Sequence, residues 1–130
     1  MKLVQNKKEY WDFIRDLRNH KDVKTGFIQQ QHISEEMHSE HMSLFGEHYY
    51  ICLVDGETAG YAAAIKNDIR VATHPDFQGK GVGKYMINEL TKKHQDIFAK
   101  VKINNEASLR LFESCGFKKK YYILEKDDAS

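Results

Sequence analysis

Apolar residues recur with a helical period in two parts of the N-terminal half of the chain. Between residues 7 and 20 they occupy the i, i+3, i+4 and i+7 positions of an amphipathic helix. A second helix is predicted over residues 34–45, where Ser34 is the expected N-cap and Gly46 the expected end. The segment 2–5, which precedes both helices, predicts a short strand.

The middle of the chain has the pattern of an antiparallel meander. Residues 49–54 and 60–65 are apolar runs, and the turn signal Asp55-Gly56 lies between them. A further turn at Asn67-Asp68 leads into a third strand over residues 69–73. We therefore expect a hairpin that is extended by one more strand.

The second half of the chain alternates helices with strands. A helix is predicted over residues 84–94, with basic residues in its last turn, and another over residues 105–115, ended by Gly116. Strands are predicted over residues 97–103 and 117–125. This order predicts an α+β fold, a mixed and largely antiparallel sheet flanked by helices in a three-layer α/β/α sandwich.

Length and composition narrow the class of protein. We expect the 130 residues to form one domain over residues 1–126, followed by a disordered tail at residues 127–130. The formal net charge of +1 argues against a nucleic-acid binder, and no apolar run is long enough for a membrane span. The two cysteines lie outside any paired motif and the N-terminus lacks a signal-peptide pattern, so a cytoplasmic setting is expected.

The strongest chemical signal is a glycine-rich turn at residues 78–83, Gln-Gly-Lys-Gly-Val-Gly, between a predicted strand and a predicted helix. Alternate glycines allow successive backbone N–H groups to point at one anion, and the helix adds its own unpaired N–H groups and dipole. We expect a phosphate or pyrophosphate ligand, with a tight turn of purely steric origin as the alternative. The P-loop and dinucleotide-binding patterns do not fit, because the glycine spacing differs and Tyr85 stands where a P-loop needs Ser or Thr.

Two stretches resemble the signatures of a known family. Residues 71–83, Val-Ala-Thr-His-Pro-Asp-Phe-Gln-Gly-Lys-Gly-Val-Gly, resemble the acetyl-CoA signature of the GNAT superfamily of N-acetyltransferases. Residues 105–117, an Asn-led helix that closes in Gly-Phe, are similar to the second signature of that family. The family's core pattern, Q/R-x-x-G-x-G/A, is met by Gln78, Gly81 and Gly83. The resemblance is good from Tyr49 onward and rests on element order alone before it.

The resemblance implies a way of binding acetyl-CoA. The strands over residues 69–73 and 97–103 would splay apart around the pantetheine arm, with the backbone near Thr73 at the acetyl carbonyl. The N–H groups of residues 79–84 would hold the CoA pyrophosphate, and Asn105 would hydrogen-bond the arm. The cofactor-binding residues expected on this basis are Val71, Ala72, Thr73, Gln78, Gly79, Lys80, Gly81, Val82, Gly83, Lys84, Asn105, Ser108 and Phe112.

The resemblance also implies a reaction, the transfer of an acetyl group from acetyl-CoA to a primary amine by direct attack in a ternary complex. Neither a metal nor a covalent enzyme intermediate is implied. We expect a small-molecule acceptor, such as an amino sugar, a polyamine or an amino acid derivative, with a protein or peptide amine as the alternative. A homodimer is expected as well. A non-catalytic acyl-CoA-binding regulatory module and a nucleotide-phosphate binder are the competing functions.

The chain departs from the family pattern where many members have a tyrosine that protonates the leaving thiolate. Phe112 occupies that position, so the proton donor is unassigned among Tyr85, Tyr121, Tyr122 and water. Asp68 is the candidate general base, because it stands at the start of the strand that leads to the glycine-rich turn. The alternative role for Asp68 is that of a turn residue.

Histidines are concentrated around the second predicted helix. His38 and His41 share a helical face, but the residues between them do not match the H-E-x-x-H zinc motif, so no metal site is expected. Because the family places its acceptor site against the first two helices, His38, His41 and Tyr49 are candidate substrate-binding residues. The alternative is a solvated polar face opposite Met37, Leu44 and Phe45.

Overall fold

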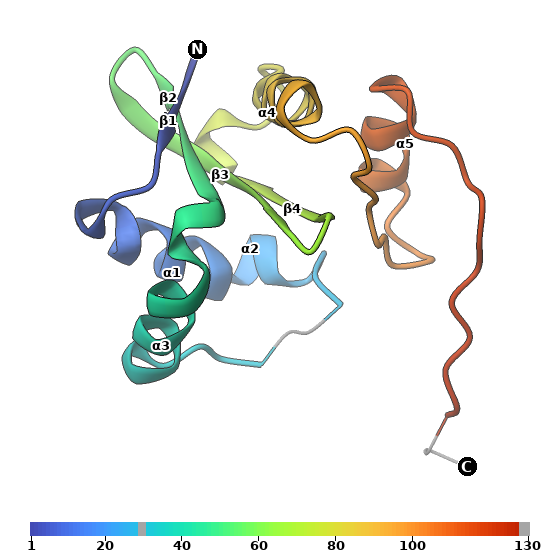
Figure 1. The fold of residues 1–130 in the computed structure, drawn as a ribbon, viewed down its shortest axis with the longest axis horizontal. Helices are drawn as coiled ribbons and strands as arrows, with labels where there is room; N and C mark the ends of the chain where they lie inside the picture. Colours follow the sequence, from blue (N-terminus) through green and yellow to red (C-terminus); the bar gives the residue numbers. More distant parts are fainter. Residues whose placement is uncertain (29–30, 128–130) are drawn as a thin grey trace.

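The computed structural model describes residues 1–28 and 31–127, and its centre is an antiparallel four-stranded sheet (Figure 1). The strands lie side by side in the order in which they occur along the chain. They are β1 (Lys2–Gln5), β2 (Tyr49–Val54), β3 (Glu57–Ile65) and β4 (Asp68–Thr73). The predicted N-terminal strand and the predicted meander are therefore confirmed.

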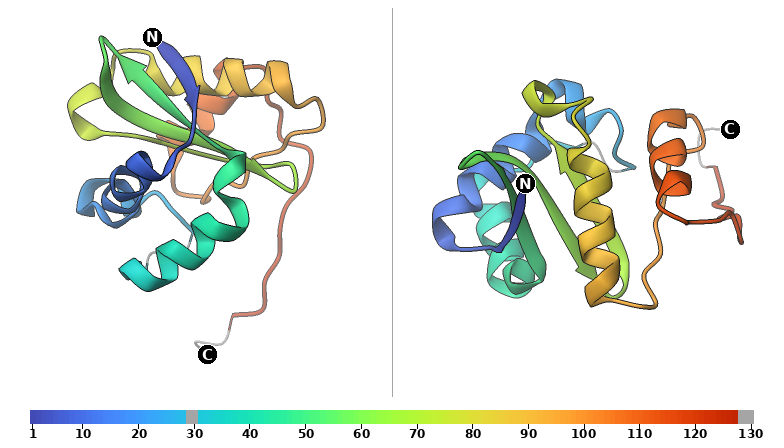
Figure 2. Two further views of the ribbon diagram at one scale, coloured as in Figure 1. Left: turned by 60° about the vertical axis from the view of Figure 1, so that its left-hand side comes forward. Right: turned by 90° about the horizontal axis from the view of Figure 1, so that it is seen from above.

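Helices cover both faces of the sheet, so that the molecule has three layers (Figure 2). One face carries α1 (Trp11–Asn19), the short α2 (Lys21–Lys24) and α3 (Glu35–Phe45). The other face carries α4 (Val82–Lys93), and α5 (Glu106–Ser114) packs on α4. Short 3₁₀ helices occur at η1 (Lys8–Tyr10), η2 (Gly46–His48) and η3 (Pro75–Phe77). The predicted α+β three-layer sandwich is confirmed.

Two hydrophobic clusters, one on each face of the sheet, explain why β3 is apolar at nearly every position. Tyr61, Ala63 and Ile65 belong to the cluster under α1 and α3, and Ala62 and Ala64 belong to the cluster under α4. A strand that is covered on both faces buries successive side chains on opposite sides, so a continuous apolar run is required.

Side-chain caps fix where two of the helices begin. The Ser34 hydroxyl accepts a hydrogen bond from the Met37 N–H at 3.1 Å, which confirms the predicted N-cap of α3. Asn105 Oδ1 accepts from the Ser108 N–H at 3.1 Å and caps α5 in the same way. Gly46 ends α3 as predicted, although η2 continues the chain directly from it.

Two predicted strands, residues 97–103 and 117–125, are absent as strands from the described part of the structure. The first segment makes a single parallel bridge to β4, between Phe98 and Asp68, and then leaves the sheet. The second runs from α5 as an extended tail that is far from the sheet in Figure 1, with Leu124 92% exposed. Both predictions were wrong for one reason. Composition reports a preference for extended backbone, whereas a strand also needs a neighbouring backbone to bond.

The buried face of α3 differs from the one that its hydrophobic residues suggest. His38 and Met42 are 3% and 2% exposed, whereas Met37 and Leu44 are 42% and 70% exposed. The alternative of a solvated polar face opposite Met37, Leu44 and Phe45 is therefore wrong for His38, which is buried, and for Met37 and Leu44, which are exposed. His38 is accommodated in the interior because its Nε2 donates a hydrogen bond to the Trp11 carbonyl at 2.8 Å.

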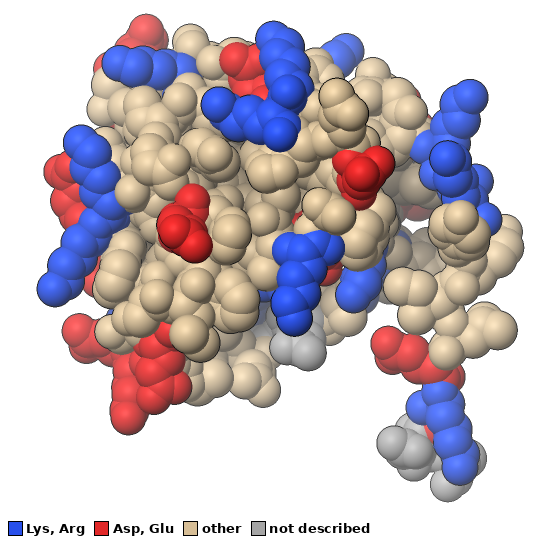
Figure 3. Space-filling model, in the orientation of Figure 1, with Lys and Arg blue, Asp and Glu red and all other residues tan. Residues whose placement is uncertain are grey.

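Charge on the surface is mixed rather than segregated. Figure 3 shows Lys and Arg side chains interspersed with Asp and Glu over the face that it displays. Within residues 1–28 and 31–127, no helix combines the length and the apolar character that a membrane crossing requires. Residues 128–130 of the expected disordered tail lie outside the described residues.

Candidate functional site

The glycine-rich turn between η3 and α4 has the backbone conformation of an anion cradle. Gly79 and Gly81 have φ values of 77° and 80°, a left-handed conformation that L side chains rarely adopt. A Cβ atom at either position would meet nothing within 4 Å, so the space around the turn is open. Glycine is therefore required at these two positions for its conformation and not because of crowding.

Backbone N–H groups without partners gather at this turn. The first hydrogen bond of α4 runs from the Tyr85 N–H to the Gly81 carbonyl at 3.0 Å, so the N–H groups of residues 82–84 precede the helical ladder. Among the described residues, the N–H groups of residues 79–81 also have no backbone acceptor. Because these donors coincide with the positive end of the α4 dipole, the turn suits a phosphate or a diphosphate.

Gly83 is constrained by packing instead. A Cβ atom on this residue of the first turn of α4 would lie 3.0 Å from Leu111 Cδ2 and 3.6 Å from Thr73 Oγ1. Its small size leaves room for the Leu111 side chain of α5, whereas the distance to Thr73 would be an ordinary contact. The alternate glycines thus serve two purposes, the turn conformation at Gly79 and Gly81 and helix packing at Gly83.

The polar residues of the turn lie at the surface. Gln78, Lys80 and Lys84 are exposed, and Val82 is buried beneath them with 1% of its surface exposed. Lys80 Nζ is 5.4 Å from the centre of the Phe77 ring, a cation–π distance. Two lysines therefore add positive charge beside the unpaired N–H groups.

One edge of β4 is paired with β3 and the other is almost open. On the open side the Ile69 N–H donates to the Phe98 carbonyl at 2.8 Å, after which residues 99–103 leave the strand. Backbone groups alternate in direction along a strand, so the N–H groups of Val71 and Thr73 point to the same side as that of Ile69. The N–H groups of Val71 and Thr73 are therefore on the edge of β4 that has no paired strand in the described part of the chain.

The predicted cofactor-binding residues of α5 have packing roles in the structure. Asn105 Nδ2 donates to the Gly26 carbonyl at 3.3 Å, which ties the start of α5 to the loop after α2. Phe112 is 6% exposed, and its ring centre is 5.1 Å from that of Phe117. Ser108 is half-buried one turn before Phe112, and Ala72 of β4 is buried in the cluster under α1.

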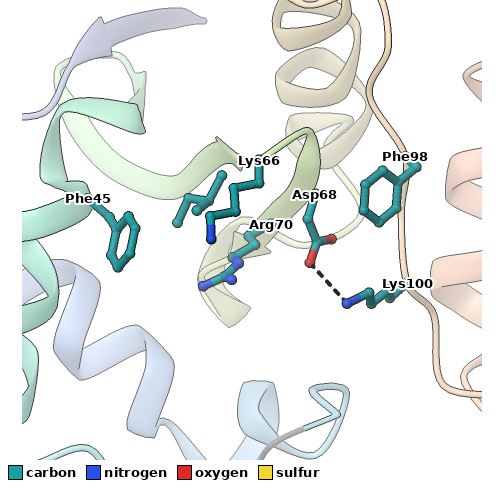
Figure 4. Close-up of a pocket in the computed structure, with 7 residues that line it drawn as sticks. Phe45, Lys66, Asp68, Arg70, Phe98 and Lys100 are labelled. Atoms are coloured by element: carbon teal, nitrogen blue, oxygen red, sulfur yellow. Dashed lines mark ion pairs between the residues drawn. The ribbon is translucent and has the colours of Figure 1, made fainter.

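A cavity of about 300 Å³ lies at the other end of β4 (Figure 4). Asp68, the candidate base, faces it and forms an ion pair with Lys100, with 3.7 Å between Oδ2 and Nζ. Lys66 and Asn67, the two central residues of the turn, have positive φ, and Asp68 closes the turn opposite Ile65 as the first residue of β4. The cavity is lined by Phe45, Ile65, Lys66, Asp68, Arg70, Phe98 and Lys100.

The turn and the cavity are separated by the length of β4. A strand of six residues spans roughly 17–20 Å at about 3.3 Å per residue. A ligand that occupies both ends and the gap between them must be long, with an anionic group at one end and its reactive group at the other.

Of the candidate substrate-binding residues, His41 and Tyr49 adjoin the cavity. His41 Nε2 is 2.8 Å from the Tyr49 hydroxyl, and the His41 ring is 5.0 Å from the ring of Phe45 in the cavity wall. Burial, together with the charges of Arg18 and Arg70, lowers the pKa of His41 to about 4, so this ring is neutral at pH 7. Burial also raises the pKa of Tyr49, which therefore keeps its proton.

His38 does not line the cavity. Its Nδ1 is 3.4 Å from Arg18 Nη1 and its Nε2 bonds the Trp11 carbonyl, so both ring nitrogens are occupied within the core. Burial lowers the pKa of His38, and a neutral ring suits an Arg donor on one nitrogen and a carbonyl acceptor on the other.

The cations of the cavity, Lys66, Arg70 and Lys100, were not among the residues singled out from the sequence. Arg70 follows Asp68 by two residues, and side chains at i and i+2 share one face of a strand, so this neighbour could have been found. Lys66 lies in the preceding turn, also two residues from Asp68, whereas Lys100 lies in the segment beyond the bridge and only the tertiary fold brings it to Asp68.

The sequence and the fold were compared with known proteins. The fold resembles spermidine N-acetyltransferase from Vibrio cholerae in complex with CoA and spermine, with a TM-score of 0.79, 17% identity, and coverage of 96% of this chain and 85% of that one. It also resembles a phosphinothricin acetyltransferase from Sinorhizobium meliloti in complex with AcCoA, with a TM-score of 0.76, 19% identity, and coverage of 90% and 74%. A third structure, the aminoglycoside acetyltransferase AAC(6')-Iy with a bisubstrate analogue, gives a TM-score of 0.73, 16% identity, and coverage of 99% and 98%. No match was found among curated proteins.

The fold is that of solved N-acetyltransferase structures, and the turn at the start of α4 has the features of an anion-binding site. The sequence matches the acetyltransferase (GNAT) family over residues 7–117, and the chain belongs to this family. It is accordingly an acyltransferase. The open turn at Gly79 and Gly81, with its unpaired N–H groups, suits a phosphate or a diphosphate. No set of three or more His, Cys, Asp or Glu side chains suited to a metal ion occurs in the described parts of the chain.

Proposed function

We propose that the protein transfers the acetyl group of acetyl-CoA to a primary amine of a small molecule, by direct attack within a ternary complex. The supporting observation is the arrangement along β4. The glycine-rich turn lies at one end, the open strand edge in the middle, and a cavity containing a carboxylate at the other end. This order matches a long donor whose anionic end and reactive end are far apart.

The donor is bound mainly by backbone groups. The N–H groups of residues 79–84 hold the diphosphate, and Lys80 and Lys84 supply charge beside it. The open edge at Val71 and Thr73 offers N–H groups to the arm and the acetyl carbonyl. Backbone donors that are already fixed by the sheet need little reorganisation when the ligand binds.

Bound acetyl-CoA supplies an acetyl group that is activated as a thioester. The acceptor nitrogen attacks the acetyl carbonyl carbon, so that a C–N bond forms while the C–S bond breaks and CoA leaves as the thiolate. The N–H groups at the open edge of β4 stabilise the carbonyl oxygen as negative charge develops on it. The proton lost by the amine passes to Asp68, directly or through a water molecule.

The proton for the departing thiolate comes from Tyr85 of α4 or from solvent in this proposal. Phe112 has no exchangeable proton, and Tyr121 and Tyr122 lie on the tail with 90% and 88% of their surfaces exposed. A free thiol has a pKa of about 8.5, so a thiolate is a tolerable leaving group near neutral pH.

The proposal is tested by incubating the protein with acetyl-CoA and a panel of primary amines while free thiol is followed with a thiol-reactive dye. We expect release of thiol that depends on the amine. Tight binding of acetyl-CoA without amine-dependent release would instead favour the non-catalytic acyl-CoA-binding module. The experiment therefore separates the enzyme from its main alternative.

The placement of the diphosphate is tested by Gly81→Glu. This change introduces a bulky anion into the turn, so we expect the affinity for acetyl-CoA to fall by about a hundredfold or more. Gly116→Glu is a matched control, because Gly116 also has a positive φ, of 93°, and open space around it, but it lies at the end of α5. Equal affinities in the two variants, measured by isothermal titration, would overturn this placement.

A further inference from the structure

The cavity at the start of β4 carries an excess of positive charge. Lys66, Arg70 and Lys100 line it, and Asp68 is its only acidic lining residue within the described chain. That carboxylate is already paired with Lys100, at 3.7 Å. Within residues 1–28 and 31–127, neither Lys66 nor Arg70 forms an ion pair with a carboxylate.

Figure 4 shows the Lys66 and Arg70 side chains directed into the open space between Phe45 and Asp68. Two cations that share a cavity repel each other unless an anion lies with them. An anionic group on the ligand would relieve this repulsion, and an arginine binds a carboxylate with two parallel hydrogen bonds.

Arg70 lies beside polar groups of the core. Its charge acts on the Tyr49 hydroxyl and opposes the rise in the pKa of that group, and the hydroxyl lies 2.8 Å from His41 Nε2. Because Tyr49 is only 1% exposed, Arg70 lies between the core and the cavity that it lines. A guanidinium has five N–H donors, so most of them are left for a ligand in the cavity.

We propose that the acceptor is a small primary amine that bears a carboxylate, an amino acid in chemical class, and that Arg70 and Lys66 bind this carboxylate. The inference rests on the proposed acetyl transfer and names its substrate class. The rings of Phe45 and Phe98 form opposite sides of the cavity in Figure 4, and Phe98 is 45% exposed, so an apolar or aromatic side chain on the acceptor has surfaces to contact.

The same charges disfavour a polyamine. A polycation needs unpaired carboxylates, whereas Asp68 is neutralised by Lys100 and the remaining charges of the cavity are positive. The spermine-bound protein of Vibrio cholerae shares the fold at 17% identity, and a likeness at this level shows the fold and not the acceptor.

The test compares matched acceptors, each amino acid against its decarboxylated amine and its amide, together with spermidine. We expect kcat/KM for the best amino acid to exceed that of the decarboxylated amine at least tenfold. A preference for spermidine or for the decarboxylated amines would overturn this inference and leave acetyl transfer standing. Failure of every amine would instead count against the proposed function.

Arg70→Gln supplies the second arm of the test. We expect it to raise KM for the amino acid about tenfold or more while KM for acetyl-CoA stays within about twofold. Binding of the N-acetylated amino acid, measured by isothermal titration, should weaken in parallel, which gives a readout that is independent of turnover. Lys7→Gln is the control, since Lys7 lies in the exposed segment before η1 and has only a weak pairing with Glu9, at 3.9 Å. Equal effects of the two variants would overturn the role of Arg70.

Discussion

His41 makes the stability of this fold depend on pH. Its pKa falls from 6.5 in the unfolded chain to about 4 in the native structure, chiefly through burial. Between these values the unfolded chain binds a proton that the native chain does not, so protonation favours unfolding. The stabilisation is complete above pH 6.5 and is lost progressively as the pH falls toward 4.

We therefore predict that the free energy of unfolding falls by about 1–3 kcal/mol between pH 7 and pH 4 through His41, after allowance for its partial exposure. Urea denaturation at stepped pH measures this slope, to which His38 adds because burial lowers its pKa as well. His41→Gln should be less stable at pH 7 and show a shallower slope, and His32→Gln, at an exposed position, should match the wild type. An unchanged slope in His41→Gln would contradict the prediction.

Single residues show where reasoning from sequence succeeds. The cap at Ser34 and the left-handed turn at Gly81 follow from local chemistry, because the residue type alone restricts what the backbone does there. The burial of His38 in α3 was harder to predict. The sequence around a polar ring in a helix does not indicate that a distant carbonyl, here that of Trp11, accepts a hydrogen bond from it.

Among the elements, β4 combines most of the proposed functions, and its two edges should respond differently to the donor. The backbone N–H groups of Arg70 and Ala72 point toward β3. Those of Val71 and Thr73 point the other way, to the edge that residues 99–103 leave unpaired. We predict that saturating acetyl-CoA slows amide exchange at Val71 and Thr73 at least tenfold, and that it changes Arg70 and Ala72 much less.

Amide exchange followed by NMR measures this pattern residue by residue. Ile69, which already donates to the Phe98 carbonyl at 2.8 Å, is the internal control and should be protected with or without the ligand. Uniform slowing along the whole strand would indicate general stabilisation rather than binding in the gap. Protection of Ile69 that appears only with the ligand would show that the bridge to Phe98 is not formed in the free protein.

The strands that were predicted wrongly mark the limit of element-level reasoning. Residues 49–54 have a partner close by in sequence across the Asp55-Gly56 turn, so their pattern was sufficient to predict β2. Residues 97–103 and 117–125 have similar composition, but their bonding depends on a backbone brought from elsewhere. The first segment pairs with β4 only at the Phe98–Asp68 bridge, and the second lies away from the sheet.

At the scale of the whole molecule, the donor bound in the proposed site would contact two layers of the fold. The turn that receives the diphosphate belongs to α4, while the cavity at the other end of β4 is bounded by Phe45 of α3. A ligand that spans these parts binds the native state and not the unfolded chain, so it must raise the free energy of unfolding by mass action. At a concentration a hundredfold above its dissociation constant, acetyl-CoA should add about 2.7 kcal/mol.

This gain can be measured by urea denaturation with increasing acetyl-CoA, and the slope of the titration gives the dissociation constant independently of turnover. ATP at the same concentrations should add much less, because it offers phosphates to the turn but has no arm to occupy the open edge of β4. Gly81→Glu should abolish the gain from acetyl-CoA, and Gly116→Glu should preserve it. If ATP stabilised the protein as strongly as acetyl-CoA, binding would rest on the turn alone. The molecule would then behave as the nucleotide-phosphate binder that the glycine-rich turn by itself allows.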